Sequence, residues 1–235
     1  MTLLEDTSAI NTFNEKALHA DLKAWYARPD DLIETPVDGF IIDIVRGDLL
    51  IEIQTRNFSA IKRKLNQLTA NHPVRLVYPI ACEKWIVKLP KDGKSPKSRR
   101  KSPKRGALVD LFAELVSFPD LLASPNFSLD VLFIQEEEVR RYDRRRGWRR
   151  QGWVTHERRL LRVVEQQLIE SPADLSHILP KTLDAPFTTA DIAKALAKSR
   201  RFTQKVAYCL REMGLLIPIG KCGNAILYTR ANARG

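Results

Sequence analysis

Apolar residues in the first quarter of the chain pass from helical spacing to strand spacing. Residues 12–26 predict a helix, because apolar residues recur every three or four positions and Glu15 shares their face. The segments 38–45 and 49–54 are rich in Ile and Val and flank an Arg-Gly-Asp tripeptide, which predicts two antiparallel strands joined by a tight turn. A second helix is expected within residues 57–72, where helical spacing returns.

The pattern beyond this helix continues to mix strands and helices. Short apolar runs predict strands at 74–81, 83–90 and 129–135, and residues 107–118 predict a helix. Helix, hairpin, helix and strands in this order favour the α/β class, with a mixed sheet flanked by helices.

From about residue 156 the composition changes and helical spacing dominates. Helices are predicted at 157–169, 187–197 and 200–214, and a strand, turn and strand follow. The last two helices and the hairpin resemble a winged helix-turn-helix domain. We therefore expect three parts: a first domain at residues 1–139, an arginine-rich linker at 140–155 and a winged helix domain at 156–235.

The positive charge is concentrated in two segments. The net charge of the 235-residue chain is +11, and residues 91–106 hold eight Lys or Arg against one Asp, while residues 140–153 hold seven Arg against one Asp. The rest of the chain is therefore slightly acidic. Such local basicity favours a polyanionic partner, and nucleic acid is expected, most simply double-stranded DNA. A solubilising insert is the alternative for residues 91–106.

The three cysteines lack CxxC spacing, which argues against a disulfide framework or a zinc site and fits a reducing cytoplasm. The first residues do not resemble a signal peptide, and no apolar run is long enough to span a membrane. A cytoplasmic protein without a membrane partner is expected. The oligomeric state stays open, a homodimer included.

Polar residues interrupt the two predicted strands of the first hairpin. Glu52 and Gln54 share one face of their strand, and Asp38 is expected to lie opposite residues 54–56, beside both. Carboxylates are the hard oxygen ligands that Mg²⁺ prefers, so Asp38 and Glu52 are predicted to hold Mg²⁺ or Mn²⁺. Asp43, of opposite parity to Asp38, is expected to be structural. A solvated polar edge is the alternative for this site.

These positions resemble the PD-(D/E)xK nuclease superfamily, which includes the restriction endonucleases. The resemblance covers residues 10–90 and rests on an acid in a first helix, an Asp at the head of a strand, and a Glu-x-Gln strand followed by a helix. It implies a restriction-endonuclease-like domain whose catalytic residues are Glu15, Asp38, Glu52 and Gln54. Gln54 stands where the superfamily usually has lysine, so it would orient water or phosphate without supplying charge. His19, one turn after Glu15, is expected to lie at the boundary between buried and exposed positions and not to act as a general base.

Side chains in the basic segments and in the last helix and hairpin are predicted to contact nucleic acid. They are Lys97, Arg99, Arg100, Lys101, Lys104, Arg105, Arg144, Arg145, Arg146, Arg149, Arg150, Arg200, Arg201, Thr203, Gln204, Lys205 and Lys221. Use of the winged helix for dimerisation or protein docking is the alternative for the last six.

The favoured function is Mg²⁺-dependent hydrolysis of DNA phosphodiester bonds. Two alternatives stay open: a non-catalytic DNA-binding regulator on a decayed nuclease fold, and a nuclease specific for RNA or for branched structures.

Overall fold

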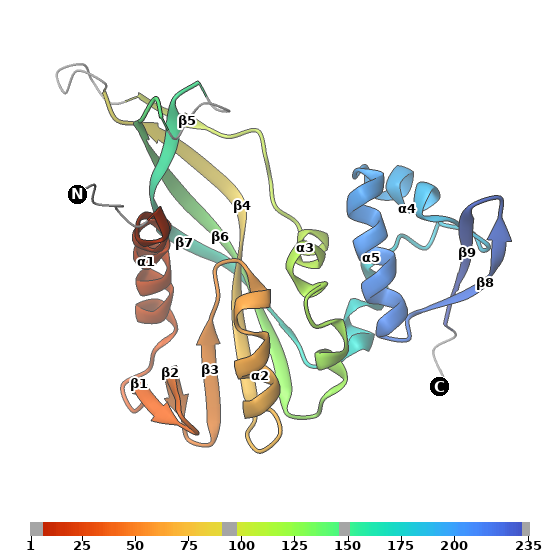
Figure 1. Cartoon of the computed structure of the whole chain (residues 1–235), viewed down its shortest axis with the longest axis horizontal. Helices are drawn as coiled ribbons and strands as arrows, with labels where there is room; N and C mark the ends of the chain where they lie inside the picture. The colour runs from red at the N-terminus through yellow and green to blue at the C-terminus, as the bar shows by residue number, and fades with distance from the viewer. Residues whose placement is uncertain (1–6, 91–97, 146–150, 232–235) are drawn as a thin grey trace, which may run out of the picture.

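The computed structural model describes residues 7–90, 98–145 and 151–231, with side chains from residue 17 onward. Seven strands form one mixed sheet in the order β1-β2-β3-β4-β6-β7, with β5 also on β4 (Figure 1). The strands are β1 (Leu32–Val37), β2 (Phe40–Arg46), β3 (Leu49–Ile53), β4 (Val74–Lys88), β5 (Ser98–Lys101), β6 (Phe127–Tyr142) and β7 (Trp153–Ile169). The α/β class with a mixed sheet flanked by helices is confirmed.

Helices cover both faces of this sheet. Leu18 and Leu22 of α1 pack on one face, and Leu65 of α2 and Phe112 of α3 pack on the other. The helices are α1 (Thr7–Tyr26), α2 (Lys62–Leu68), α3 (Phe112–Leu115), α4 (Thr189–Leu196) and α5 (Arg200–Glu212). Short 3-10 helices lie at Phe58–Ala60, Leu108–Leu111, Pro119–Ala123 and Pro172–Ile178. The described helices include none that is long and apolar enough to cross a membrane.

The first three strands form an antiparallel meander, after which the sheet becomes parallel. β1 pairs with β2 and β2 with β3 in antiparallel register, whereas β3 pairs with β4 in parallel. Asp38 and Gly39 form the turn from β1 to β2, both with positive φ, as a two-residue hairpin turn requires. The predicted strand at 38–45 therefore begins later, at Phe40, and follows a strand that the sequence analysis did not predict.

β6 and β7 form a long antiparallel hairpin, and this corrects two predictions. Residues 157–169 are not a helix. The segment 140–155, expected to be a linker, lies at the tip of this hairpin, where residues 140–142 end β6 and residues 153–155 begin β7, and residues 146–150 lie outside the described part. The physical reason is electrostatic pairing between a glutamate-rich β6 and an arginine-rich β7. Glu136 is fully buried and is 2.6 Å from Arg158, while Lys84 on β4 contacts both Glu136 and Glu138.

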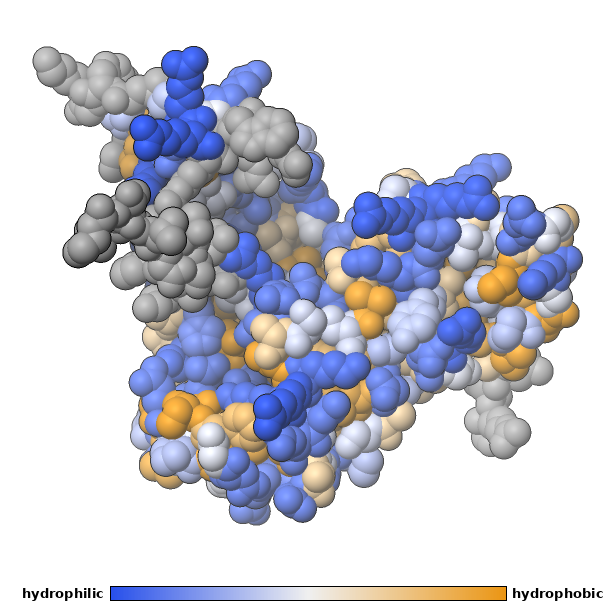
Figure 2. Space-filling model, in the orientation of Figure 1, coloured by the Kyte–Doolittle hydropathy of each residue, from blue (hydrophilic) through white to orange (hydrophobic). Residues whose placement is uncertain are grey.

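The C-terminal elements share a core with the large sheet. After β7, α4 and α5 are followed by a separate hairpin of β8 (Leu216–Cys222) and β9 (Ala225–Arg230). Val206 and Leu210 of α5 belong to the same buried cluster as Phe112 and Leu115 of α3. Figure 2 shows a notch between the upper end of the long strands and these C-terminal helices. Two lobes therefore border one surface depression while sharing one core.

Candidate functional site

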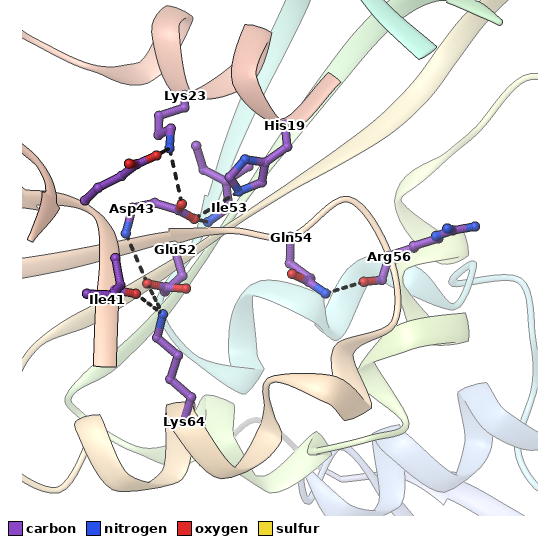
Figure 3. Close-up of polar contacts among 10 residues, drawn as sticks. His19, Lys23, Ile41, Asp43, Glu52, Ile53, Gln54, Arg56 and Lys64 are labelled. Carbon is purple, nitrogen blue, oxygen red and sulfur yellow. Dashed lines mark hydrogen bonds and ion pairs between the residues drawn. The ribbon is translucent and has the colours of Figure 1, made fainter. Parts of the chain in front are cut away.

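β2 and β3 stop pairing where two carboxylates face each other. The last registered pair beyond the turn is Ile44 with Ile51. At the next position the Ile53 backbone N–H donates to Asp43 Oδ2 at 2.9 Å, and the Asp43 N–H donates to Glu52 Oε1 at 3.3 Å (Figure 3). Two side chains thus replace the backbone ladder, and two acids meet where the strands diverge.

Helix α1 supplies two basic side chains to Asp43. His19 and Lys23 lie one turn apart on the same helix face, with His19 Nε2 at 3.1 Å from Asp43 Oδ2 and Lys23 Nζ at 3.7 Å from Asp43 Oδ1. Burial alone would raise the pKa of Asp43, but the His19 hydrogen bond and charge give a net lowering. The same hydrogen bond raises the pKa of His19 above its ordinary value. Asp43 is therefore held as a carboxylate.

Helix α2 supplies a third cation, Lys64, on the other side of the pair. Its ammonium lies 2.6 Å from Glu52 Oε1 and donates to the Ile41 carbonyl at 2.6 Å. The Glu52 side chain is only 7% exposed, and burial raises its pKa while Lys64 offsets part of that effect. Glu52 is thus a desolvated acid beside the Lys64 ammonium.

The predicted position of Asp38 beside Glu52 and Gln54 is wrong. Asp38 lies in the turn before β2, five residues from Asp43, and its Oδ2 is 2.9 Å from His72 Nε2. The strand begins only at Phe40, so the expected register placed the wrong acid opposite Glu52. Asp43 takes the place that was predicted for Asp38.

Gln54 is also placed differently from the prediction. Its amide nitrogen donates to the carbonyls of Arg56 at 2.6 Å and Asn57 at 3.3 Å, and Figure 3 shows it directed toward that loop. Gln54 therefore closes the turn between β3 and α2. The side chain beside Glu52 is that of Lys64, so a cation stands where the neutral amide of Gln54 was expected.

Of the two expected metal ligands, Asp38 and Glu52, only Glu52 lies in this site, and the second carboxylate there is Asp43. Within the described residues no group of three or more His, Cys, Asp or Glu side chains has an arrangement that could hold a metal ion. Glu15 lies one turn before His19 in α1, and its side chain is outside the described part of the chain.

The basic residues near β5 are partly neutralised. Arg99 pairs with Glu137 at 3.0 Å, and Glu83 contacts both Lys101 at 2.5 Å and Arg105 at 3.8 Å. Exposed basic side chains without a described ion pair are Arg100, Lys104, Arg144 and Arg145. Lys97, Arg146, Arg149 and Arg150 lie outside the described residues.

Of the six nucleic-acid contacts predicted in the C-terminal elements, Thr203 is wrong and Lys205 is engaged within the protein. Thr203 is fully buried, and its hydroxyl donates to the carbonyls of Thr189 and Arg200. Lys205 is half-buried and donates to the Ala113 carbonyl, since α5 packs against α3. The side chains that stay exposed are Arg200, Arg201, Gln204 and Lys221.

Four residues of this site were not predicted to belong to it, namely His19, Lys23, Asp43 and Lys64. One signal for Asp43 was present, because Asp43 and Glu52 lie equally far from Arg46 and Leu49, the pair that flanks the turn. Counting outward from the turn places the two acids opposite each other. No sequence signal located Lys64, because its contact depends on how α2 packs against the sheet.

Comparison with known proteins places this chain among relatives. Residues 16–170 match the family described as "Domain of unknown function (DUF8091)". A protein of Treponema pallidum (strain Nichols) named "Uncharacterized protein" is 30% identical over 223 residues, which cover 94% of this chain and 87% of that protein. No solved structure matches the chain. The family match ends just after β7, so it spans the whole large sheet and all five site residues, His19, Lys23, Asp43, Glu52 and Lys64.

Proposed function

The chain belongs to the DUF8091 family, and for this member we propose metal-dependent hydrolysis of DNA phosphodiester bonds by a site of the PD-(D/E)xK type. The observation that carries the proposal is the convergence of Asp43 and Glu52 at diverging strand ends, with Lys64 at 2.6 Å from Glu52. The order α1, β1–β3, α2 and β4 agrees with the pattern of helix, Glu-x-Gln strand and helix on which the resemblance rests.

The donor set at this site fits a divalent cation. Asp43 and Glu52 offer hard oxygen ligands, and Mg²⁺ commonly uses one or two carboxylates, completing its shell with water and phosphate oxygens. The pKa of Glu52 is raised by burial despite Lys64, which indicates that further positive charge would be stabilising there. A bound Mg²⁺ or Mn²⁺ would activate water and stabilise charge on the scissile phosphate.

The protein's own cations would act from both sides of the acids. His19 and Lys23 keep Asp43 ionised and fix its orientation. Lys64 stands beside Glu52, where its ammonium could pair with a phosphate oxygen and stabilise developing negative charge. In this proposal Lys64 performs the cationic role that Gln54 cannot.

Exposed basic residues would hold the nucleic acid through its phosphates. Arg100, Lys104 and Arg144 lie at one end of the sheet, and Arg200 and Arg201 lie at the start of α5. The order α4, α5, β8 and β9 supports a winged helix-turn-helix assignment for the C-terminal elements, as does an antiparallel bridge from Phe187 to Tyr228. The notch in Figure 2 lies between the upper end of the large sheet and the C-terminal helices, and it would accommodate a strand of the nucleic acid.

A second candidate function is DNA binding without cleavage. Two observations favour it: each acid is already neutralised by a protein cation, and Gln54 faces away from them. In that case Asp43 and Glu52 would serve only the fold, and binding would need no metal.

A nuclease assay with paired variants separates these functions. Wild type is incubated with Mg²⁺ or Mn²⁺ and labelled duplex, single-stranded, branched and RNA substrates, alongside Asp43→Asn, Glu52→Gln and the control Asp38→Asn. We expect cleavage by wild type and by Asp38→Asn, because an Asn-Gly turn preserves the hairpin. Asp43→Asn and Glu52→Gln should lose cleavage and retain binding. Absence of cleavage by wild type on all four substrates would overturn catalysis and leave the binding protein.

A further inference from the structure

A pocket opens on the sheet at the end remote from the two acids. It is half open to solvent, has a volume of about 510 Å³ and is lined by residues of β4 to β7 and the segment after β4, namely Val87, Leu89, Arg99, Glu137, Val139, His156, Glu157 and Arg159. Val87 is eleven residues beyond Leu76, the partner of Glu52 on β4, a separation of roughly 35 Å along a strand. The pocket is therefore separate from the candidate site of hydrolysis.

The floor of this pocket is apolar. Val87 and Val139 are directly paired neighbours on β4 and β6, and each is only 7% exposed. Together with Leu89 they form the apolar part of the lining. An apolar floor of this kind suits one face of a planar ring.

The walls of the pocket are charged and form two pairs. Arg99 pairs with Glu137 at 3.0 Å and its guanidinium also lies 5.1 Å from the centre of the Trp85 ring. Arg159 pairs with Glu157 at 2.6 Å. Both arginine side chains are about half exposed, so Arg159 and the face of Arg99 that is turned away from Trp85 can stack on a ligand, while the glutamates offer hydrogen-bond acceptors.

We propose that this pocket holds one unstacked nucleobase of a single-stranded nucleic acid. A nucleobase combines a flat apolar face with hydrogen-bonding groups on its rim, which matches an apolar floor between guanidinium planes and carboxylates. The volume lies in the range of pockets that enclose small ligands. The exposed cations Arg100 and Lys104, on and just beyond β5, could hold the adjoining phosphates.

This proposal rests on the proposed function in taking nucleic acid as the partner, and it narrows the substrate. A base in an intact duplex cannot reach such a pocket without being unstacked. The preferred substrate would therefore carry a single-stranded segment, as a branch or an overhang does.

The test measures binding of the full-length protein in EDTA, so that metal-dependent cleavage does not enter. Fluorescently labelled dC and dT 12-mers and a 12-base-pair duplex are titrated at one fixed salt concentration. The cytosine oligomer should bind at least threefold more tightly than the thymine oligomer, because its exocyclic amine can donate to Glu137 or Glu157, whereas thymine presents an oxygen. Equal affinities for the two oligomers would overturn the proposal.

Variants localise the effect to the pocket. Val139→Phe fills the floor and should weaken the cytosine oligomer at least fivefold while changing duplex affinity less than twofold. If Val139→Phe unfolds, as thermal melting would reveal, Arg159→Ala serves instead, because this exposed side chain can be removed without touching the core. Arg144→Ala is the matched control and should weaken single strand and duplex alike. Equal weakening of both ligands by Arg159→Ala would also overturn the proposal.

The outcomes distinguish the pocket from the nuclease. A cytosine preference without any metal-dependent cleavage keeps the pocket and rejects the nuclease. Cleavage without a cytosine preference rejects the pocket and keeps the nuclease. Failure to bind any nucleic acid rejects both.

Discussion

Replacing Glu138 with Gln should remove a large share of the stability of the long β6–β7 hairpin. The Glu138 carboxylate is almost fully buried and accepts hydrogen bonds from Arg140 Nε at 2.7 Å, Thr155 Oγ1 at 2.8 Å and Lys84 Nζ at 3.2 Å. Burial alone would raise its pKa, but these partners lower the pKa from 4.5 to about 2. The substitution keeps the size of the side chain and removes only its charge and acceptor capacity.

The size of the effect follows from the shift of the Glu138 pKa. Each pKa unit corresponds to about 1.4 kcal/mol, so the ionised form contributes about 3 kcal/mol to the free energy of unfolding at neutral pH. The folded pKa is below the unfolded pKa, so this contribution is complete above about pH 5.5 and is lost as the pH falls toward 2. At pH 3 less than half of it should remain.

Urea denaturation of wild type and Glu138→Gln at pH 7, 5 and 3.5 measures this effect. The control is Glu165→Gln, the same change at an exposed position of β7. Glu138→Gln should cost about 3 kcal/mol at pH 7, and the cost should shrink as the solution is acidified, whereas Glu165→Gln should cost less than about 0.5 kcal/mol throughout. A cost for Glu138→Gln that equals the control, or that does not change with pH, would refute the electrostatic account.

Three further predictions concern the site, the basic surface and the shared core. Lys64→Met should lower the cleavage rate about 100-fold with little change in binding, and Lys64→Arg should restore part of it; single-turnover kinetics measure both, and unchanged rates for Lys64→Met would exclude a role for this ammonium. Neutralising Arg100 and Lys104 together, as Gln, should reduce the slope of log affinity against log salt by about 2 for duplex DNA, measured by anisotropy, and an unchanged slope would mean no phosphate contact. Leu210→Ala should cost about 3 kcal/mol in urea denaturation, because Leu210 is 2% exposed, against less than about 1 kcal/mol for Ile217→Ala on β8, which is 47% exposed; similar costs would contradict the shared core.

The sheet could be predicted from the sequence where alternation is regular, and it was missed where bulges interrupt alternation. β7 pairs with β6 through three register shifts, each of which adds a residue to β7 and reverses the face of the residues that follow. Its apolar residues therefore lose the two-residue period, and those at 160, 161, 164 and 168 take on helical spacing. Only long-range pairing with β6 distinguishes this strand from a helix.

The site was predicted in part for a similar reason. Glu52 was found because it interrupts an apolar strand, but its partner was assigned from the expected start of the preceding strand. Because the chain forms β1 and the Asp38–Gly39 turn first, β2 begins only at Phe40, and Asp43 is the acid opposite Glu52. Lys64 belongs to a short helix whose placement follows from packing of Leu65 and Leu68, which local sequence does not reveal.

The hydrogen bonds that Asp43 and Glu52 make to the strand backbones give these two acids a second reason to persist. Each carboxylate accepts from the N–H of the neighbouring strand, so losing either acid leaves a half-buried donor unsatisfied. A descendant that had abandoned chemistry would still be under selection to keep both acids for stability. Retention of this pair across relatives would therefore reflect the architecture of the sheet as much as catalysis. Retention of Lys64 would be the better indicator that a relative still hydrolyses its substrate.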